Sequence, residues 1–262
     1  MGGLIMGRLK DKVCIVTGGN SGIGMKTAQV FAKEGAKLVL TDVSESNKDK
    51  ILKEIQNAGA QALFIRGDIT NAEDNQKLMQ AAVDAFGKID VLVNCAGVLE
   101  HGLKPIEEFT DSDYDFVSKI NIKGTMSITR EACKVMAAQK RGNIISVASI
   151  SGKLGSGGAV YTATKGAVIA LTRHIALRFA GQGIRANCVC PGTVWTPMTK
   201  GQLKEERSPA ADEFYNIVNK HSDLDVGICK DIDIANILLF LASDESRVIT
   251  GQAIDCDCGC YL

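Results

Sequence analysis

The chain has 262 residues, 45% of them hydrophobic and 23% charged, which suits one α/β domain with a substantial core. Thirty Lys and Arg residues balance thirty Asp and Glu residues, so the charge argues against a nucleic-acid partner. No apolar run approaches the roughly 20 residues of a membrane-spanning helix, and the first ten residues do not resemble a secretory signal. We therefore expect no membrane partner and a cytoplasmic location.

Short β-branched segments alternate with longer segments of helical periodicity along the chain. We expect strands at residues 13–17, 37–42, 62–66, 91–94, 143–148, 184–190 and 252–256. We expect helices at residues 23–34, 48–58, 72–86, 111–139, 159–180 and 232–243. This alternation predicts right-handed βαβ crossovers and a single-domain, doubly wound (Rossmann) parallel sheet over residues 1–262, with helices on both faces.

One long connection interrupts this alternation near residues 196–230. It carries Pro197, Pro209 and many charged residues between the sixth strand and the last helix. Long connections in compact domains are frequently lids or binding loops. We expect this segment to cover the substrate, with Trp195 and Met198 as apolar walls of its pocket.

A glycine-rich turn follows the first strand, from Thr17 to Gly24, and leads into a helix. Glycines let the backbone approach a pyrophosphate, and the helix N-terminus supplies free N–H groups. The second strand ends at Asp42, whose carboxylate suits the adenosine ribose hydroxyls of NAD(H) and repels a 2′-phosphate. Ser21 and Val43 provide no basic residue nearby, so we predict NAD(H) as the cofactor.

Tyr161 and Lys165 lie at the start of a helical segment with a spacing that places both on one face. A phenol has an ordinary pKa of about 10. A neighbouring ammonium favours the phenolate, so we expect Lys165 to lower the pKa of Tyr161 and make it a general acid/base.

An ordered set of motifs spans residues 9 to 259. It comprises Thr17–Gly24, Asn94-Cys95-Ala96-Gly97, Asn121, Ser149, Tyr161 with Lys165, and Pro191-Gly192. In this order and spacing the chain resembles the classical short-chain dehydrogenases/reductases.

The resemblance implies four catalytic residues. Tyr161 would exchange a proton with the carbonyl or alcohol oxygen, and Ser149 would hydrogen-bond the same oxygen. Lys165 would hold the nicotinamide ribose, and Asn121 would anchor a water that links Lys165 to solvent. Ser149 fits the family pattern better than Ser151, although it precedes Tyr161 by 12 positions, one fewer than in many members.

The resemblance also implies a cofactor site that extends along the carboxyl ends of the strands. Asp68 and Ile69 would lie near the adenine, and the segment from Pro191 would grip the nicotinamide carboxamide. The full set is Gly18, Asn20, Ser21, Gly22, Ile23, Gly24, Asp42, Val43, Asp68, Ile69, Asn94, Ala96, Gly97, Tyr161, Lys165, Pro191, Gly192, Val194 and Thr196. Cys95 replaces the more usual second Asn of its motif.

These residues predict an oxidoreductase that moves a hydride between NAD(H) and a secondary alcohol or ketone. Hydroxysteroids, polyols and diols all remain candidate small-molecule substrates, with the Trp195/Met198 mouth favouring a bulky apolar one. An alternative is a 3-oxoacyl thioester (acyl-carrier-protein) reductase, but similar reductases usually prefer NADPH and carry Arg where this chain has Gln182. An alternative of another class is a non-catalytic NAD(H)-binding sensor or scaffold.

Three further expectations concern assembly, metals and pocket contacts. The family typically associates through helices such as 111–139 and 159–180, so we expect a homotetramer or homodimer. No His, Cys, Asp and Glu set has convincing zinc spacing, so we expect no metal. Cys256, Cys258 and Cys260 would share one face of a terminal strand, and His101 is a candidate substrate contact.

Overall fold

The computed structural model describes residues 7–202, 204–221 and 228–260. Its main sheet has the strand order β3-β2-β1-β4-β5-β6-β9, and every neighbouring pair is parallel. The strands are β1 (Val13–Thr17), β2 (Lys37–Asp42), β3 (Ala62–Arg66), β4 (Val91–Asn94), β5 (Gly142–Val147), β6 (Ile184–Pro191) and β9 (Ala253–Cys256). The order reverses between β1 and β4, where ligands bind in doubly wound folds. The predicted fold class is confirmed.

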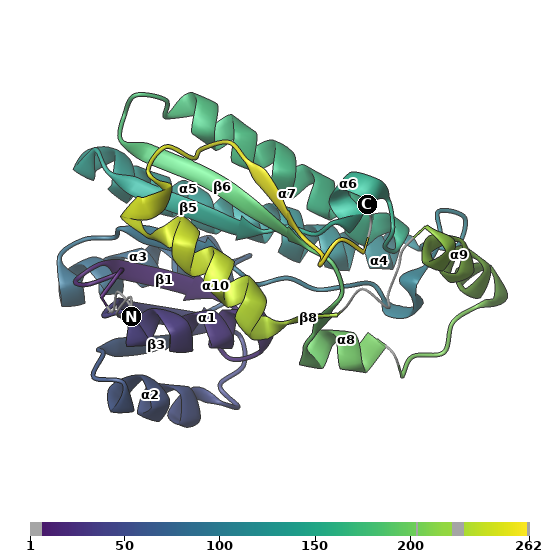
Figure 1. Cartoon of the computed structure of the whole chain (residues 1–262), viewed down its shortest axis with the longest axis horizontal. Helices are drawn as coiled ribbons and strands as arrows, with labels where there is room; N and C mark the ends of the chain where they lie inside the picture. The colour runs from purple at the N-terminus through teal and green to yellow at the C-terminus, as the bar shows by residue number, and fades with distance from the viewer. Residues whose placement is uncertain (1–6, 203, 222–227, 261–262) are drawn as a thin grey trace, which may run out of the picture.

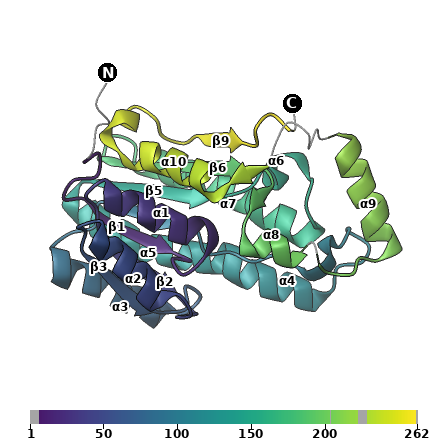
Figure 2. The ribbon, with the colours of Figure 1, turned by 60° about the horizontal axis from the view of Figure 1, so that its bottom comes forward.

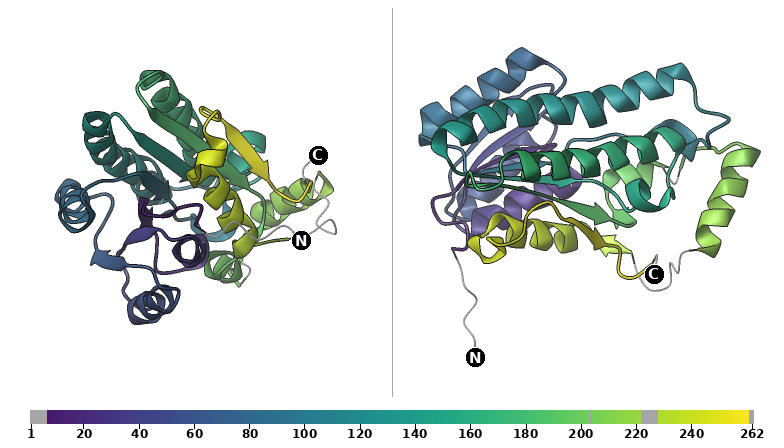
Figure 3. Two further views of the ribbon diagram at one scale, coloured as in Figure 1. Left: turned by 60° about the vertical axis from the view of Figure 1, so that its left-hand side comes forward. Right: turned by 90° about the horizontal axis from the view of Figure 1, so that it is seen from above.

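Helices cover both faces of this sheet (Figure 1, and Figure 3, left). One face carries α1 (Gly22–Lys33), α2 (Lys48–Asn57) and α10 (Asp231–Ala242), and the other carries α3 (Ala72–Phe86), α5 (Thr125–Gln139) and α7 (Ala159–Arg178). The short α6 (Ser151–Leu154) lies across the first part of α7.

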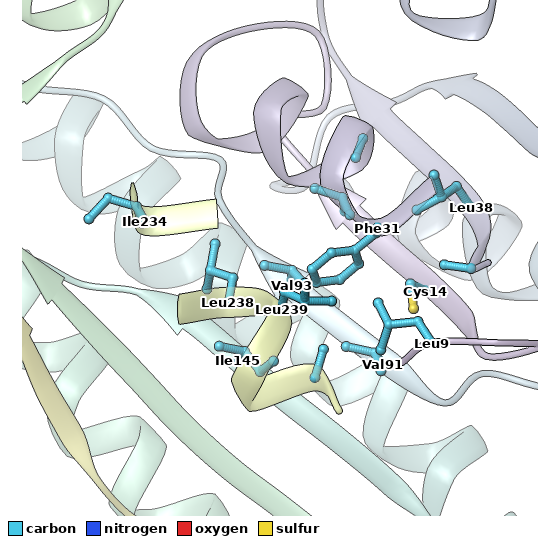
Figure 4. Close-up of a cluster of buried hydrophobic side chains, with 14 of the residues drawn as sticks. Leu9, Cys14, Phe31, Leu38, Val91, Val93, Ile145, Ile234, Leu238 and Leu239 are labelled. Atoms are coloured by element: carbon cyan, nitrogen blue, oxygen red, sulfur yellow. The ribbon is translucent and has the colours of Figure 1, made fainter. Parts of the chain in front are cut away.

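The core lies in two layers, one on each side of the sheet. Alternate residues of β1 point to opposite faces, so Val16 belongs to one hydrophobic cluster and Ile15 to the other. Phe31 of α1 is fully buried in the first cluster, against Leu238 and neighbouring side chains of α10 (Figure 4). The cluster fixes α1, and therefore the turn that precedes it, against the sheet.

The predicted continuous helix at residues 111–139 is wrong. The chain forms α4 (Asp111–Ser118), then a π-helical turn η2 (Lys119–Gly124), and then α5. A π turn inserts one extra residue in the helical ladder and is frequent at functional sites. Asn121 lies inside this turn, with its side chain bonded to the loop after β4.

The segment predicted as a lid contains structure of its own. It forms β7 (Val194–Trp195), α8 (Pro197–Gln202), α9 (Pro209–Lys220) and β8 (Cys229–Lys230), and β7 pairs with β8. Figure 2 shows α8 and α9 beyond one end of the sheet, near α4 and α6. Residues 203 and 222–227 of the predicted lid lie outside the described residues.

The predicted single face of Cys256, Cys258 and Cys260 is also wrong. Strand β9 ends at Cys256, and Cys258 has a left-handed backbone with φ of 59°, which ends the alternation. Cys258 is exposed, with its Sγ 3.2 Å from the Sγ of Cys229. In the described ranges, no three His, Cys, Asp or Glu side chains form a group that could hold a metal ion.

Two 3₁₀ turns, η1 (His101–Leu103) and η4 (Asp244–Ser246), complete the described secondary structure. Among the residues the structure describes, no helix is long and apolar enough to cross a membrane.

Candidate active site

A cavity of about 450 Å³ opens at the carboxyl ends of β1, β2, β3 and β4. The glycine-rich turn between β1 and α1 forms one wall, and the segment from Thr196 to Met198 closes one end. Asp42 and Asp68 lie where β2 and β3 end. This is the position at which doubly wound folds bind nucleotides.

The glycines of the turn are required by close approach and by backbone conformation. A Cβ at Gly24 would overlap the carbonyl oxygen of Gly18, because the helix begins directly against the turn. Gly18 and Gly22 have φ of 64° and 50°, a region that side chains disfavour. The first N–H groups of α1 therefore stand beside a wall in which Gly18, Gly22 and Gly24 leave the backbone open, which fits a pyrophosphate.

The Asp42 carboxylate is fixed in the wall of this cavity. Its oxygens accept hydrogen bonds from the backbone N–H of Asn20 at 3.2 Å and of Ser44 at 3.0 Å. Asn20 itself does not line the cavity, because its amide bonds Ser44, Ser46 and Asn47 and shapes the turn.

The basic residue Arg66, at the end of the neighbouring strand β3, is paired in the sheet with Asp42. Its Nε donates to the carbonyl of Val43 at 3.1 Å. The sequence analysis looked for a basic residue near the ribose only at positions 21 and 43. The parallel register of β2 and β3, which pairs Arg66 with Asp42, would have pointed to Arg66.

The start of the loop after β4 is held by the buried side chain of Thr17. The Thr17 hydroxyl accepts the N–H groups of Cys95 and Ala96, both at 3.0 Å, and brings Ala96 and Gly97 to the cavity. Asn94 points away from the cavity instead, donating to Thr129 and Ser146 inside the core.

Asn121 connects this loop to α7. Its side chain exchanges two hydrogen bonds of 2.9 Å with the backbone of Val98 and donates to the Thr164 hydroxyl at 3.1 Å. A Cβ at Gly97 would lie 3.2 Å from the Asn121 Oδ1 and 3.4 Å from the Lys165 Nζ. Gly97 therefore leaves room for Asn121 and Lys165 to approach each other.

Lys165 is buried and Tyr161 is half-buried, both beside β5. Lys165 Nζ donates to the Val147 carbonyl at 2.8 Å and lies 5.5 Å from the centre of the Tyr161 ring. Burial raises the pKa of Tyr161 to about 12, partly offset by a hydrogen bond with Ser149. Burial lowers the pKa of Lys165 to about 8. The net shift of the Tyr161 pKa in the protein alone is therefore upwards, opposite to the expected lowering, because desolvation dominates.

A second cavity, of about 170 Å³, adjoins the first and contains Ser149 and Tyr161. Apolar walls come from Leu99, Leu103 and Met198, and Met198 lines both cavities. Thr199, Gln202, Arg207, Tyr215, Val218 and Asn219 of the predicted lid complete the lining.

Two of the expected pocket contacts are wrong. Trp195 lines neither of these cavities and is 48% exposed, since its ring lies against Lys200 at 5.1 Å. His101 points to the surface, where it pairs with Glu205 at 2.9 Å. Met198 is confirmed as a wall.

Most residues implied for the cofactor line the two cavities. The first cavity takes Gly18, Ser21, Gly22, Ile23, Gly24, Asp42, Val43, Asp68, Ile69, Ala96, Gly97 and Thr196, and the second takes Tyr161, Gly192 and Val194. Phe116 of α4 and Lys119 and Ile120 of the π turn also line the first cavity and were not predicted.

Comparisons with known proteins agree with this architecture. A family model described as enoyl-(acyl carrier protein) reductase matches residues 18–261. The chain is 35% identical to the 3-oxoacyl-[acyl-carrier-protein] reductase FabG of Thermotoga maritima, over 97% of this chain and all of that protein. It is 36% identical to (+)-borneol dehydrogenase 2 of Salvia officinalis, over 96% of this chain and 90% of that protein.

A solved structure agrees as well. The crystal structure of levodione reductase superposes with a TM-score of 0.86 at 30% identity, covering 96% of this chain and 98% of that one. The fold and the site define a nucleotide-dependent oxidoreductase, and the chain belongs to the classical short-chain dehydrogenase/reductase family.

Proposed function

We propose that the protein transfers a hydride between NAD(H) and a small secondary alcohol or the corresponding ketone. The observation that carries this proposal is the junction of the two cavities. Ser149 and Tyr161 face the smaller cavity, and Lys165 lies behind Tyr161. A nicotinamide cofactor supplies the hydride chemistry when it is bound, and the chain's own groups orient and move the proton.

In this proposal Tyr161 is the general acid/base. In ketone reduction its hydroxyl gives a proton to the carbonyl oxygen, and Ser149 donates a hydrogen bond to the same oxygen as charge develops there. The Lys165 ammonium compensates the charge left on the phenolate, and Asn121 holds the loop that contains Gly97 against Lys165. Alcohol oxidation uses the same groups in reverse.

NAD(H) is the proposed cofactor because Asp42 holds a carboxylate in the wall of the larger cavity, where a 2′-phosphate would be repelled. A 3-oxoacyl thioester reductase with NADPH is the second candidate. The family description and the similarity to the Thermotoga maritima reductase favour it, as does Arg66 beside Val43.

The substrate cavity combines apolar walls with Gln202, Arg207 and Asn219. Since Trp195 is outside this wall and only Met198 of the pair lines it, the argument for a bulky apolar substrate such as a steroid is weaker. We therefore place polyols, diols and small cyclic ketones ahead of steroids.

The test is initial-rate measurement of NAD⁺ and NADP⁺ reduction with a panel of polyols, diols, hydroxysteroids and simple secondary alcohols, and of 3-oxoacyl thioester reduction in reverse. Tyr161→Phe should lower kcat by about 10²- to 10⁴-fold with cofactor binding retained. Tyr114→Phe, at an exposed position of α4, is the matched control. Full activity of Tyr161→Phe would refute the proposed mechanism, and binding without turnover in the wild type would favour the sensor alternative.

We further propose a homotetramer or homodimer in the cytoplasm. Tyr114 and Phe116 of α4, Met126 of α5 and Leu177 of α7 expose large apolar side chains on the helices expected to associate. A monomeric mass by light scattering at micromolar concentration would contradict this assembly.

A further inference from the structure

Glu100 is a buried carboxylate beside the candidate active site. It lies three positions after Gly97 in the loop that follows β4, and it is only 2% exposed. Burying a carboxylate is costly unless hydrogen bonds compensate the lost hydration. Its oxygens accept from the backbone N–H of Tyr161 at 3.0 and 3.3 Å, and the N–H of Val160 provides a further hydrogen bond.

These bonds cap α7 from outside the helix. The residue before the helix, Gly158, has no side chain with which to satisfy the first N–H groups. The Lys104 carbonyl accepts the N–H of Ala159 at 2.9 Å, and Glu100 takes the next two donors. A negative charge at this end also complements the helix dipole.

Gly158 and Glu100 fit each other sterically. A Cβ at Gly158 would overlap Oε1 of Glu100, so the carboxylate occupies the space that a side chain would need. The fit is a second observation, independent of the hydrogen bonds, that ties Glu100 to the start of α7.

Charges of both signs face Tyr161 and its cap. Lys165 favours the phenolate, whereas Glu100 disfavours it. Asp113 of α4 faces Glu100, and the Lys104 ammonium pairs with Asp113 at 2.7 Å. Burial raises the pKa of Glu100, and its backbone hydrogen bonds oppose that rise.

Two other ionisable side chains near the site are engaged elsewhere. His101, next in sequence to Glu100, is turned towards Glu205 at the surface. Arg207, across the smaller cavity, pairs with Asp212 at 2.9 Å. Glu100 and Lys165 are therefore the opposed charges at Tyr161.

We propose that Glu100 is a positioning residue for proton transfer: its carboxylate caps α7, holds Tyr161 in register with Ser149 and places a negative charge at the start of the helix that carries the phenol. The inference rests on the role proposed above for Tyr161. Lys165 and Glu100 then act in opposite directions on one phenol, and together they set the pH range in which it exchanges its proton.

The test compares Glu100→Gln with Glu107→Gln, an exposed position in the same loop. Gln keeps an acceptor oxygen and removes the charge. We expect the tyrosine-dependent limb of the pH profile of kcat/KM for alcohol oxidation to move to lower pH by about half to one unit in Glu100→Gln only. A lower kcat in Glu100→Gln without a shift of this limb of the pH profile would mean that Glu100 only caps the helix, and would overturn the proposal.

A second readout does not depend on turnover. Near-ultraviolet absorbance reports tyrosinate formation, and Tyr161→Phe supplies the blank. We expect an earlier onset of Tyr161 ionisation in Glu100→Gln. An earlier onset in a protein that turns over no substrate would support the inference while refuting the proposed function, whereas an unchanged onset would refute the inference alone.

Gly158→Ala covers the case in which Glu100→Gln does not fold. The added methyl group displaces the carboxylate without changing any charge. We expect at least a tenfold loss of kcat with the cofactor KM unchanged. Wild-type kinetics in Gly158→Ala would contradict the proposal.

Discussion

Replacing Asp42 with Asn tests whether one carboxylate selects the cofactor. One Asp42 oxygen accepts the N–H of Asn20 and the other accepts the N–H of Ser44. Asn keeps an acceptor for one of these groups and loses the other hydrogen bond, so the substitution removes the charge and one hydrogen bond of the turn. Asp49→Asn, at an exposed position in the first turn of α2, makes the same change of charge away from the cavity and is the control.

The magnitude follows from Coulomb's law. Two unit charges about 4 Å apart interact by about 1 kcal/mol in water and about 4 kcal/mol at an effective dielectric constant near 20. Asp42 is partly buried, so the relevant value lies between these limits. Arg66 beside Val43 offsets part of the repulsion. Since each 1.4 kcal/mol is a factor of ten, Asp42 should favour NAD⁺ over NADP⁺ by about 5- to 700-fold.

The assay is kcat/KM for NAD⁺ and for NADP⁺ with one substrate that the panel identifies. Asp42→Asn should lower the NAD⁺/NADP⁺ ratio at least about fivefold, mainly through a lower KM for NADP⁺, and Asp49→Asn should leave it unchanged. A ratio that does not change in Asp42→Asn would show that the carboxylate does not face the ribose. A wild-type preference for NADP⁺ would assign the dominant role to Arg66 and favour the thioester reductase.

Three further predictions address the fold and the turn. Phe31→Ala removes a fully buried ring and should cost about 3–5 kcal/mol in the free energy of unfolding, measured by denaturant titration; a cost below about 1 kcal/mol would contradict the packing. Gly24→Ala places a methyl group against the Gly18 carbonyl and should weaken NADH binding at least tenfold by fluorescence titration, with unchanged affinity as the contrary result. The hydrogen bond from Lys12 lowers the pKa of Asp244 in the folded protein. The pair therefore stabilises the fold fully above the pKa of an unfolded Asp, about 3.9. This stabilisation is lost as the pH falls through the lower pKa of the folded state. Because Asp244 is 78% exposed, Asp244→Asn should cost at most about 1 kcal/mol near neutral pH and nothing in acid; an equal cost at both pH values would contradict this sign.

The sequence predicted the first four strands at the bounds that the structure shows. The residues of β1 and β4 are buried on both faces and those of the edge strand β3 are half-buried, and in each case the apolar run coincides with the strand. Helix ends differed by one or two residues, for example at α7, which ends at Arg178 instead of residue 180. Periodicity was sufficient here because packing and local propensity favour the same conformation.

The structure in residues 194–230 was not predictable in the same way. Strand β7 has two residues and pairs only with β8, some 35 positions later. Neither strand has enough residues to produce a pattern, and their pairing depends on the tertiary fold. The prediction for the C-terminal cysteines was wrong for a related reason, because the left-handed backbone at Cys258 ends the alternation of side chains along the strand.

The site residues that belong to sequence motifs were predicted from the sequence. The residues that join the site only through three-dimensional contacts were not. Glu100 bonds to an N–H group 61 positions later, and nothing in the spacing marks it. Arg66 reaches the wall through the register of two parallel strands. The wrong direction for the pKa of Tyr161 has the same origin, because burial is a property of the fold and not of the Tyr-x-x-x-Lys spacing.

The π turn links the contacts of Asn121, the loop after β4 and the start of α7. An unbroken helix from Asp111 to Gln139 would satisfy its own backbone, but it would not place Asn121 against Val98. The backbone hydrogen bonds of the π turn are less regular than those of an α-helix. In this geometry the Asn121 amide holds the loop that contains Gly97 and Glu100. That loop in turn caps α7, so the position of Tyr161 depends on Asn121 through backbone contacts as well as through any water that Asn121 holds.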